Sequence, residues 1–190
     1  MLRRLAGFIF RIWGWKILGS LPDGIEKFVL VIAPHTSLYD FVLGRLALTS
    51  LGLKVKFLIK KEFFFFPLGP LLKYWGGIPV DRGKNKNIIL QVAALYRKYD
   101  KLIIAITPEG TRKLTKNWKK GFYYLAKKAN VPLILGYLDY GKKEAGVGPL
   151  FYTGVDVNKD FAFMEDFYKR RTARFPENFN LSPMYLDKPD

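Results

Sequence analysis

The chain has 190 residues, of which 49% are hydrophobic and 16% aromatic, and its 32 Lys and Arg against 16 Asp and Glu give a net charge of +16. This length and composition exclude a disordered chain and predict one domain with a substantial core, while the charge indicates an anionic partner such as nucleic acid, a membrane surface or a phosphorylated substrate. The absence of cysteine excludes disulfides, thiolate catalysis and Cys-ligated zinc, and one histidine without clustered carboxylates argues against a transition metal.

Residues 1–20 carry apolar side chains at near-helical spacing, interrupted by Arg3, Arg4, Arg11 and Lys16. The segment is too short and too charged to span a bilayer, and Arg11 and Lys16 break the apolar run that a signal peptide would need. We therefore expect an amphipathic helix at the membrane interface, with cations facing anionic headgroups. A helix that packs on its own domain is the alternative, because periodicity does not distinguish the two.

The only histidine, His35, lies between an apolar run at residues 28–33, which predicts a buried strand, and helical periodicity at 41–51. Asp40 follows five residues later, a spacing that on one continuous helix would separate the two side chains by about 140°. The pair can meet if His35 precedes the helix, and Ser37 as N-cap with Asp40 three residues later supplies such a start. Asp40 would then fix the imidazole tautomer so that the other ring nitrogen can take a proton. The alternative is a loop histidine beside a capping aspartate.

The remaining elements alternate along the chain. Short apolar runs predict strands at residues 27–33, 55–60, within 76–82, and at 101–106, 131–139 and 148–155. Apolar residues at helical spacing predict helices at 37–51, 84–99, 118–130 and around 160–173. This alternation predicts an α/β fold in which residues 21–190 form a single domain, a mixed sheet flanked by helices. Four consecutive phenylalanines, 63–66, predict either core or the wall of a lipid-binding channel.

A second polar cluster, residues 107–112, follows the predicted strand 101–106 and reads Thr-Pro-Glu-Gly-Thr-Arg. Gly110 allows an unusual backbone angle or the close approach of a ligand, and Arg112 offers a planar fork of donors that suits phosphate. Several lysines follow. A charge run is usually a solvated face, but this one begins at a strand end, where ligands bind in open α/β sheets.

Together these segments resemble the glycerolipid acyltransferase family, whose bacterial members include 1-acylglycerol-3-phosphate acyltransferases. Four blocks match in the order of the family, with a lysine-containing segment between the first two. The four blocks are His35 to Asp40 (HxxxxD), Gly77 to Arg82, Pro108 to Arg112 (PEGTR) and Val131-Pro132, and the lysine-containing segment is Lys60-Lys61-Glu62-Phe63. HxxxxD with PEGTR downstream is a specific combination.

The resemblance implies a glycerol-3-phosphate acyltransferase-like fold and acyl transfer from acyl-CoA or acyl-carrier protein to a lysophospholipid, most simply 1-acyl-sn-glycerol-3-phosphate. His35 would be the general base and Asp40 its orienting partner. The substrate-binding residues would be Lys60, Arg82, Glu109, Gly110, Thr111 and Arg112. No metal or further cofactor is implied, and neither is nucleic acid. We expect a peripheral protein on the cytoplasmic face of the cell membrane.

Two alternatives stay open. The acceptor could be another lysolipid, such as a lyso-ornithine lipid or a lysoglycolipid, whose neutral headgroup would leave Arg82 and Arg112 without a phosphate. The chain could also be a non-catalytic basic protein that binds membranes or nucleic acid, which explains the charge but not the His-Asp pair followed by PEGTR.

Overall fold

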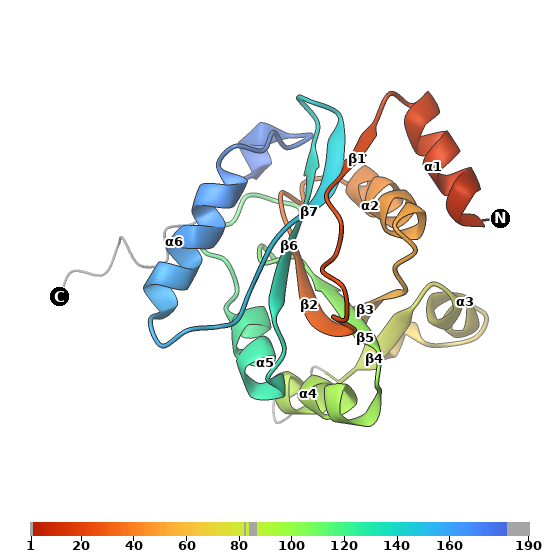
Figure 1. The fold of residues 1–190 in the computed structure, drawn as a ribbon. Helices are drawn as coiled ribbons and strands as arrows, with labels where there is room; N and C mark the ends of the chain where they lie inside the picture. The colour runs from red at the N-terminus through yellow and green to blue at the C-terminus, as the bar shows by residue number, and fades with distance from the viewer. Residues whose placement is uncertain (1, 82, 84–86, 182–190) are drawn as a thin grey trace.

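One sheet of seven strands forms the centre of the computed structural model, which describes residues 2–81, 83 and 87–181 (Figure 1). The strands are β1 (Lys16–Leu18), β2 (Lys27–Ile32), β3 (Val55–Lys60), β4 (Gly77–Val80), β5 (Leu102–Ile106), β6 (Leu133–Asp139) and β7 (Glu144–Phe151). Their spatial order is β1-β7-β6-β2-β5-β3-β4. Every pairing is parallel except the β6–β7 hairpin. The predicted single-domain α/β fold with a mixed sheet is therefore confirmed.

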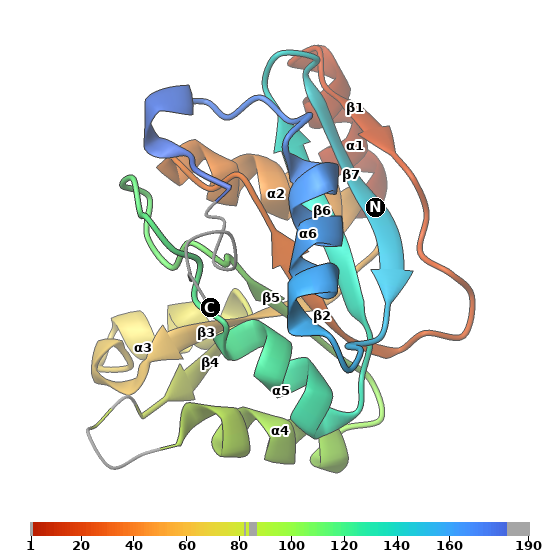
Figure 2. The same cartoon turned by 90° about the vertical axis from the view of Figure 1, so that its left-hand side faces the viewer.

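Helices cover both faces of this sheet (Figures 1 and 2). They are α1 (Leu2–Ile12), α2 (Leu38–Ser50), α3 (Leu68–Tyr74), α4 (Ile88–Lys98), α5 (Gly121–Ala129) and α6 (Val157–Tyr168), with short 3-10 turns at Lys61–Phe63 and Pro176–Asn178. The main core joins α4, α5 and α6 to one face, and α1 and α2 pack on the other. No helix in the described part of the chain is long and apolar enough to cross a bilayer.

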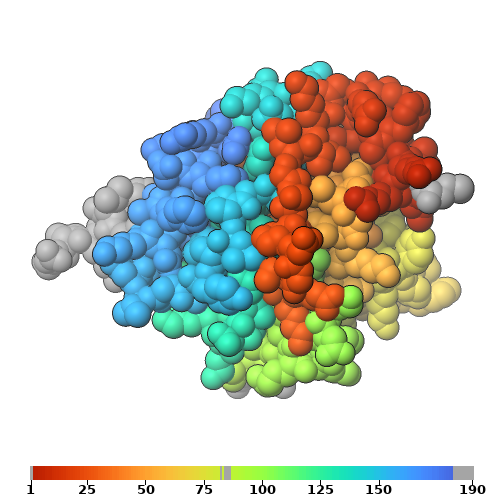
Figure 3. Space-filling view, in the orientation of Figure 1, coloured from red at the N-terminus to blue at the C-terminus, as the bar shows by residue number. Residues whose placement is uncertain are grey.

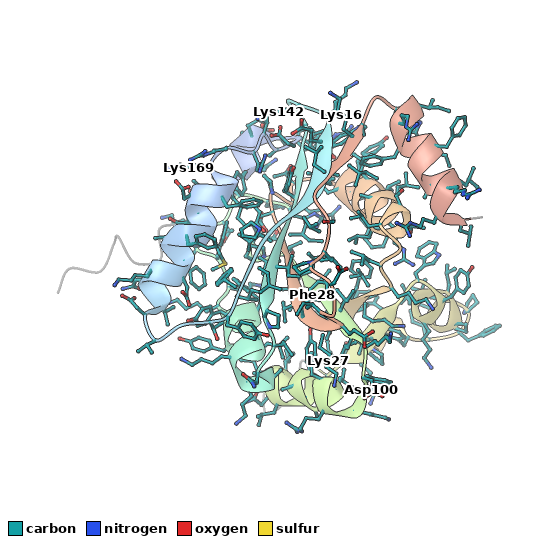
Figure 4. All side chains as sticks on the ribbon, in the orientation of Figure 1. Lys16, Lys27, Phe28, Asp100, Lys142 and Lys169 are labelled. Carbon is teal, nitrogen blue, oxygen red and sulfur yellow. The ribbon has the colours of Figure 1, made fainter. Side chains whose placement is uncertain are left out.

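The central strand β2 is buried on both sides, as expected for a parallel strand between helix layers. Val29 and Val31 face the α4–α6 layer, while Phe28 and Leu30 face the opposite core. Figure 4 labels Phe28 near the middle of the molecule, with Lys27 at the strand start beside Asp100. The apolar run that predicted this strand therefore fills two cores at once.

The N-terminal helix is shorter than the predicted residues 1–20 and ends at Ile12. Gly14 turns the chain with a positive φ of 77°, and residues 16–18 then form β1, the edge strand beside β7. Lys16 donates its backbone N–H to the carbonyl of Lys143, and Figure 4 shows Lys16 next to Lys142 at this edge. The apolar residues after Gly14 thus belong to the domain rather than to the helix.

Three other elements differ from the prediction. Strand β7 runs from Glu144 to Phe151 instead of 148–155, because the glycines of its first half resemble a turn in the sequence. A Cβ on Gly146 would lie 2.5 Å from the Leu18 carbonyl, so only glycine lets β1 approach. Helix α6 begins at Val157 because Asp156 caps it, and α3 was not predicted. The first residues expected for α4, 84–86, lie outside the described part.

Candidate active site

The predicted motifs gather at one end of the sheet. His35 follows β2, Glu109 to Arg112 follow β5, and Lys60 ends β3, and these three strands are adjacent and parallel. The carboxyl ends of parallel strands lie at the same edge, so segments far apart in the sequence are neighbours there. The block Gly77 to Arg82 begins with β4, the next strand along, but Arg82 itself lies outside the described residues.

His35 and Asp40 form the predicted pair. His35 Nδ1 lies 3.3 Å from Asp40 Oδ2, and Ser37 caps α2 in a capping box with Asp40. The same Oδ2 accepts hydrogen bonds from the backbone N–H groups of Thr36 at 2.7 Å and Ser37 at 2.8 Å. The loop therefore turns the imidazole back onto the first turn of α2, with Nδ1 facing Asp40. Nε2 is the ring nitrogen that does not face Asp40.

Burial and hydrogen bonding act in opposite directions on Asp40, which is 5% exposed. Loss of water opposes its ionisation, but hydrogen bonds from His35, Tyr140, Ser37 and Thr36 outweigh this effect and hold its pKa below the ordinary value. Asp40 is therefore a carboxylate at neutral pH, as a group that orients an imidazole must be.

Glu109 lies behind His35 and is only 2% exposed. Its Oε1 accepts a hydrogen bond of 3.0 Å from the backbone N–H of His35, and its buried Oε2 has no hydrogen-bond partner among the described residues. Burial raises the pKa of Glu109 to about 8, with the nearby charge of Asp40 adding to the rise. This side chain is thus placed to support the His35 loop as a neutral acid, and it is not directed at an acceptor in solvent.

The other predicted substrate-binding residues are exposed at the same edge. Gly110 has a φ of 63°, which is the expected unusual backbone angle, and a Cβ there would lie 2.8 Å from the Lys119 side chain. Thr111 accepts a hydrogen bond from the backbone of Lys113. Arg112 and Lys60 are exposed, which leaves their cationic groups accessible to an anionic ligand.

A cavity of about 810 Å³ opens beside His35 and Asp40. Its size falls within the range of roughly 300–1,000 Å³ that is common for ligand pockets. Most lining side chains are apolar, and they come from β2, α2, β3, α4, β5 and α5: Ile32, Phe41, Leu48, Phe57, Leu58, Ile59, Ile88, Ile89, Val92, Ala105, Ile106, Phe122 and Leu125. Polar groups lie with His35, Asp40 and Gly110 on the lining, namely Arg45, Asn87, Thr107 and Lys119. The arrangement suits a long apolar group with a reactive polar end near His35.

Sequence reasoning missed two residues beside the pair. Tyr140, 100 residues after Asp40, donates a hydrogen bond of 2.6 Å to Asp40 Oδ1. Arg174 stacks on the Tyr39 ring at 3.8 Å and lies beside the Tyr140 hydroxyl. Neither belongs to a recognisable motif, and a lone tyrosine after a strand carries no signal of its partner.

Comparison with known proteins gives two results. A family model described as Acyltransferase matches residues 20–135, which is more than half of the chain. The crystal structure of the 1-acyl-sn-glycerophosphate (LPA) acyltransferase PlsC from Thermotoga maritima superposes with a TM-score of 0.62 at 15% identity, covering 89% of this chain and 76% of that chain. No curated protein sequence matches. The similarity of fold agrees with the family match, and the chain therefore belongs to the acyltransferase family of enzymes.

Proposed function

We propose that this acyltransferase moves a fatty acyl group from a thioester, acyl-CoA or acyl-carrier protein, to the hydroxyl of 1-acyl-sn-glycerol-3-phosphate, which gives phosphatidic acid. The observation that carries the proposal is the His35–Asp40 pair at the edge of a large apolar cavity. The cavity takes the acyl chain, and the pair activates the acceptor. Glu109 is assigned to holding the His35 loop through the backbone N–H.

The chemistry follows from the geometry of the imidazole. Nδ1 faces Asp40, so Nε2 accepts the proton of the acceptor hydroxyl as its oxygen attacks the thioester carbonyl carbon. The tetrahedral intermediate collapses with cleavage of the C–S bond, and the thiolate takes the proton from His35. The products are the new ester and a free thiol. Base catalysis of about 10² to 10⁴ together with positioning is enough for an activated thioester.

Basic residues at the strand ends can bind the phosphate group of the acceptor. Lys60 ends β3 and Arg112 follows the neighbouring strand β5, and both side chains are exposed. Lys119 lines the cavity. Arg112 can hold two phosphate oxygens at once. Arg82 lies outside the described residues. We propose that it binds the same phosphate because of its position in the motif.

The acceptor is a lipid, and exposed apolar side chains offer a surface for a membrane. They lie on α1, around α3 and on the exposed side of α2: Leu2, Leu5, Phe8, Ile12, Trp13, Leu38, Val42, Phe63, Phe65, Phe66, Leu71, Tyr74 and Trp75. Figure 3 shows α1, α2 and α3 on one side of the molecule, away from α6. We assign this side, the α1–α3 surface, to peripheral docking on anionic lipid, with Arg4 and Arg11 facing the headgroups. Phe66 is 87% exposed, which favours lipid over core for part of the phenylalanine run.

The test is thiol release from palmitoyl-CoA on anionic vesicles, with and without lysophosphatidic acid, for the unaltered protein and His35→Ala. We expect release that requires both the lysolipid and His35, while vesicle binding by His35→Ala stays unchanged. Full activity of His35→Ala would refute the mechanism. If palmitoyl-CoA gives no release, acyl-carrier protein and lysolipids with neutral headgroups are the next substrates, and no transfer across that panel would refute the proposed reaction.

A further inference from the structure

The Asp40 carboxylate has different partners on its two oxygens. Oδ2 accepts from the backbone of Thr36 and Ser37 and faces His35, whereas Oδ1 accepts the short hydrogen bond, 2.6 Å, from the Tyr140 hydroxyl. A carboxylate held at one oxygen alone can rotate about its Cβ–Cγ bond. The Tyr140 bond fixes the second oxygen and so determines which oxygen meets the imidazole.

Tyr140 is itself held by two separate parts of the chain, the segment after α6 and the N-terminal segment. Its backbone N–H donates to the Thr172 carbonyl at 2.9 Å. Its ring meets the Trp15 ring edge-on, with centroids 5.0 Å apart and planes at 88°. Trp15 in turn packs on Phe10 of α1 at 5.5 Å. These contacts make the position of the hydroxyl a consequence of the packed core rather than of a mobile side chain.

We propose that Tyr140 is a positioning residue of this enzyme: its hydroxyl orients Asp40, and Asp40 thereby holds His35 in the tautomer that accepts the acceptor's proton. The inference rests on the proposed function, because it assigns Tyr140 to that same reaction. Tyr140 does not reach the substrate in this role. It acts through Asp40, and the packing of Trp15 supplies the rigidity that the alignment needs.

The electrostatic surroundings agree with a donor role for the hydroxyl. Burial raises the pKa of Tyr140, and the adjacent Asp40 charge raises it further, against the lowering effect of Arg174. Glu109 is the other acidic group close to Asp40, and its raised pKa favours the neutral form. Tyr140 therefore remains a protonated phenol and donates at neutral pH, where Asp40 is ionised.

The test compares Tyr140→Phe with Tyr123→Phe. Tyr123 is a matched control, since its hydroxyl also donates to a carboxylate, Asp160 Oδ2 at 2.8 Å, but on the α5–α6 side of the sheet. We expect Tyr140→Phe to lower kcat about 10-fold with little change in either KM, the effect of one hydrogen bond to a charged group. Tyr123→Phe should lower the melting temperature and leave kcat unchanged.

A spectroscopic measurement makes the outcome independent of activity. His35 is the only histidine in the chain, so its two ring nitrogens are resolved in the ¹⁵N NMR spectrum of protein labelled at histidine. At pH 8 we expect one Nδ1–H tautomer in the unaltered protein and in Tyr123→Phe, and a mixture of tautomers in Tyr140→Phe. Failure of acyl transfer in the unaltered protein would overturn the proposed function alone. An unchanged kcat and an unchanged tautomer in Tyr140→Phe would overturn the role of Tyr140.

Discussion

Replacement of Glu109 by glutamine should raise stability at alkaline pH and leave it nearly unchanged in acid. Burial raises the pKa of Glu109 to about 8 from an ordinary value of 4.5. The folded protein therefore retains the Glu109 proton across this interval while the unfolded chain has lost it. Stability that Glu109 contributes in the protonated form is complete below pH 4.5 and is lost as the pH rises to about 8.

The size of the effect follows from the same values. One pKa unit corresponds to about 1.4 kcal/mol. The difference in the pKa of Glu109 between the folded and the unfolded chain therefore lowers the free energy of unfolding by about 3 to 5 kcal/mol at alkaline pH. Glutamine cannot ionise and resembles the neutral acid in shape, and its carbonyl can still accept from the His35 backbone N–H. Glu109→Gln is therefore expected to lose none of this stability as the pH rises.

The assay is urea unfolding at pH 5 and pH 9 for the unaltered protein, Glu109→Gln and Glu177→Gln. Glu177 is an exposed glutamate in the 3-10 turn Pro176–Asn178, so its replacement controls for the loss of one carboxylate. We expect the unaltered protein and Glu177→Gln to lose stability between the two pH values, and Glu109→Gln to lose less by several kcal/mol. An equal pH dependence of all three proteins would show that Glu109 is ionised in the fold and would refute the reasoning.

Three further replacements test the edge of the sheet and the exposed surface. Gly110→Ala should destabilise the fold by about 1 to 2 kcal/mol in urea unfolding, because alanine is strained at a φ of 63° and meets Lys119; an unchanged midpoint would contradict this. Arg112→Ala should raise KM for lysophosphatidate about 10-fold or more without raising that for acyl-CoA, whereas an unchanged KM would favour a lysolipid with a neutral headgroup. Phe66→Ser should weaken binding to anionic vesicles about 10-fold with no loss of melting temperature. The control is Val155→Ser, because Val155 is 99% exposed but lies just before α6, away from the α1–α3 surface. Equal weakening by both replacements would show that the α1–α3 surface is not the docking site.

Local patterns predicted the parts of the site that are local in the chain. The capping box around Ser37 and the spacing of His35 from Asp40 depend on six consecutive residues, so the sequence contains all the information that their geometry requires. Strand β2 was predicted because its burial on both faces leaves an uninterrupted apolar run. The short strand β1 was missed because its three residues continue an apolar segment that begins as a helix.

The position of Glu109 shows what a motif alone leaves undecided. PEGTR predicts a ligand-binding strand exit, but it does not say which of its side chains turn inward. Arg112 is exposed, whereas Glu109 is buried against the backbone of His35, because β2 and β5 are adjacent and their exits pack on each other. The order of the strands in the sheet decides which residue of the motif is buried and which is exposed. Hydrophobic periodicity in the sequence does not predict that order.

Tyr140 extends the same argument to a longer range. The β6–β7 hairpin brings residue 140 beside the start of α2, and it does so because β6 is the neighbour of β2 in the sheet. Trp15 immediately precedes the edge strand β1, whose pairing with β7 places the Trp15 ring against the ring of Tyr140. The Asp40 carboxylate is thus held by residues from the β1 to β2 half of the sheet, so a change in α1 packing has a structural route, through Trp15 and Tyr140, to the proposed general base His35. In the proposed mechanism the N-terminal segment therefore contributes to the alignment of His35 as well as to the exposed surface, because α1 packs on the same cluster as Trp15 and Tyr140.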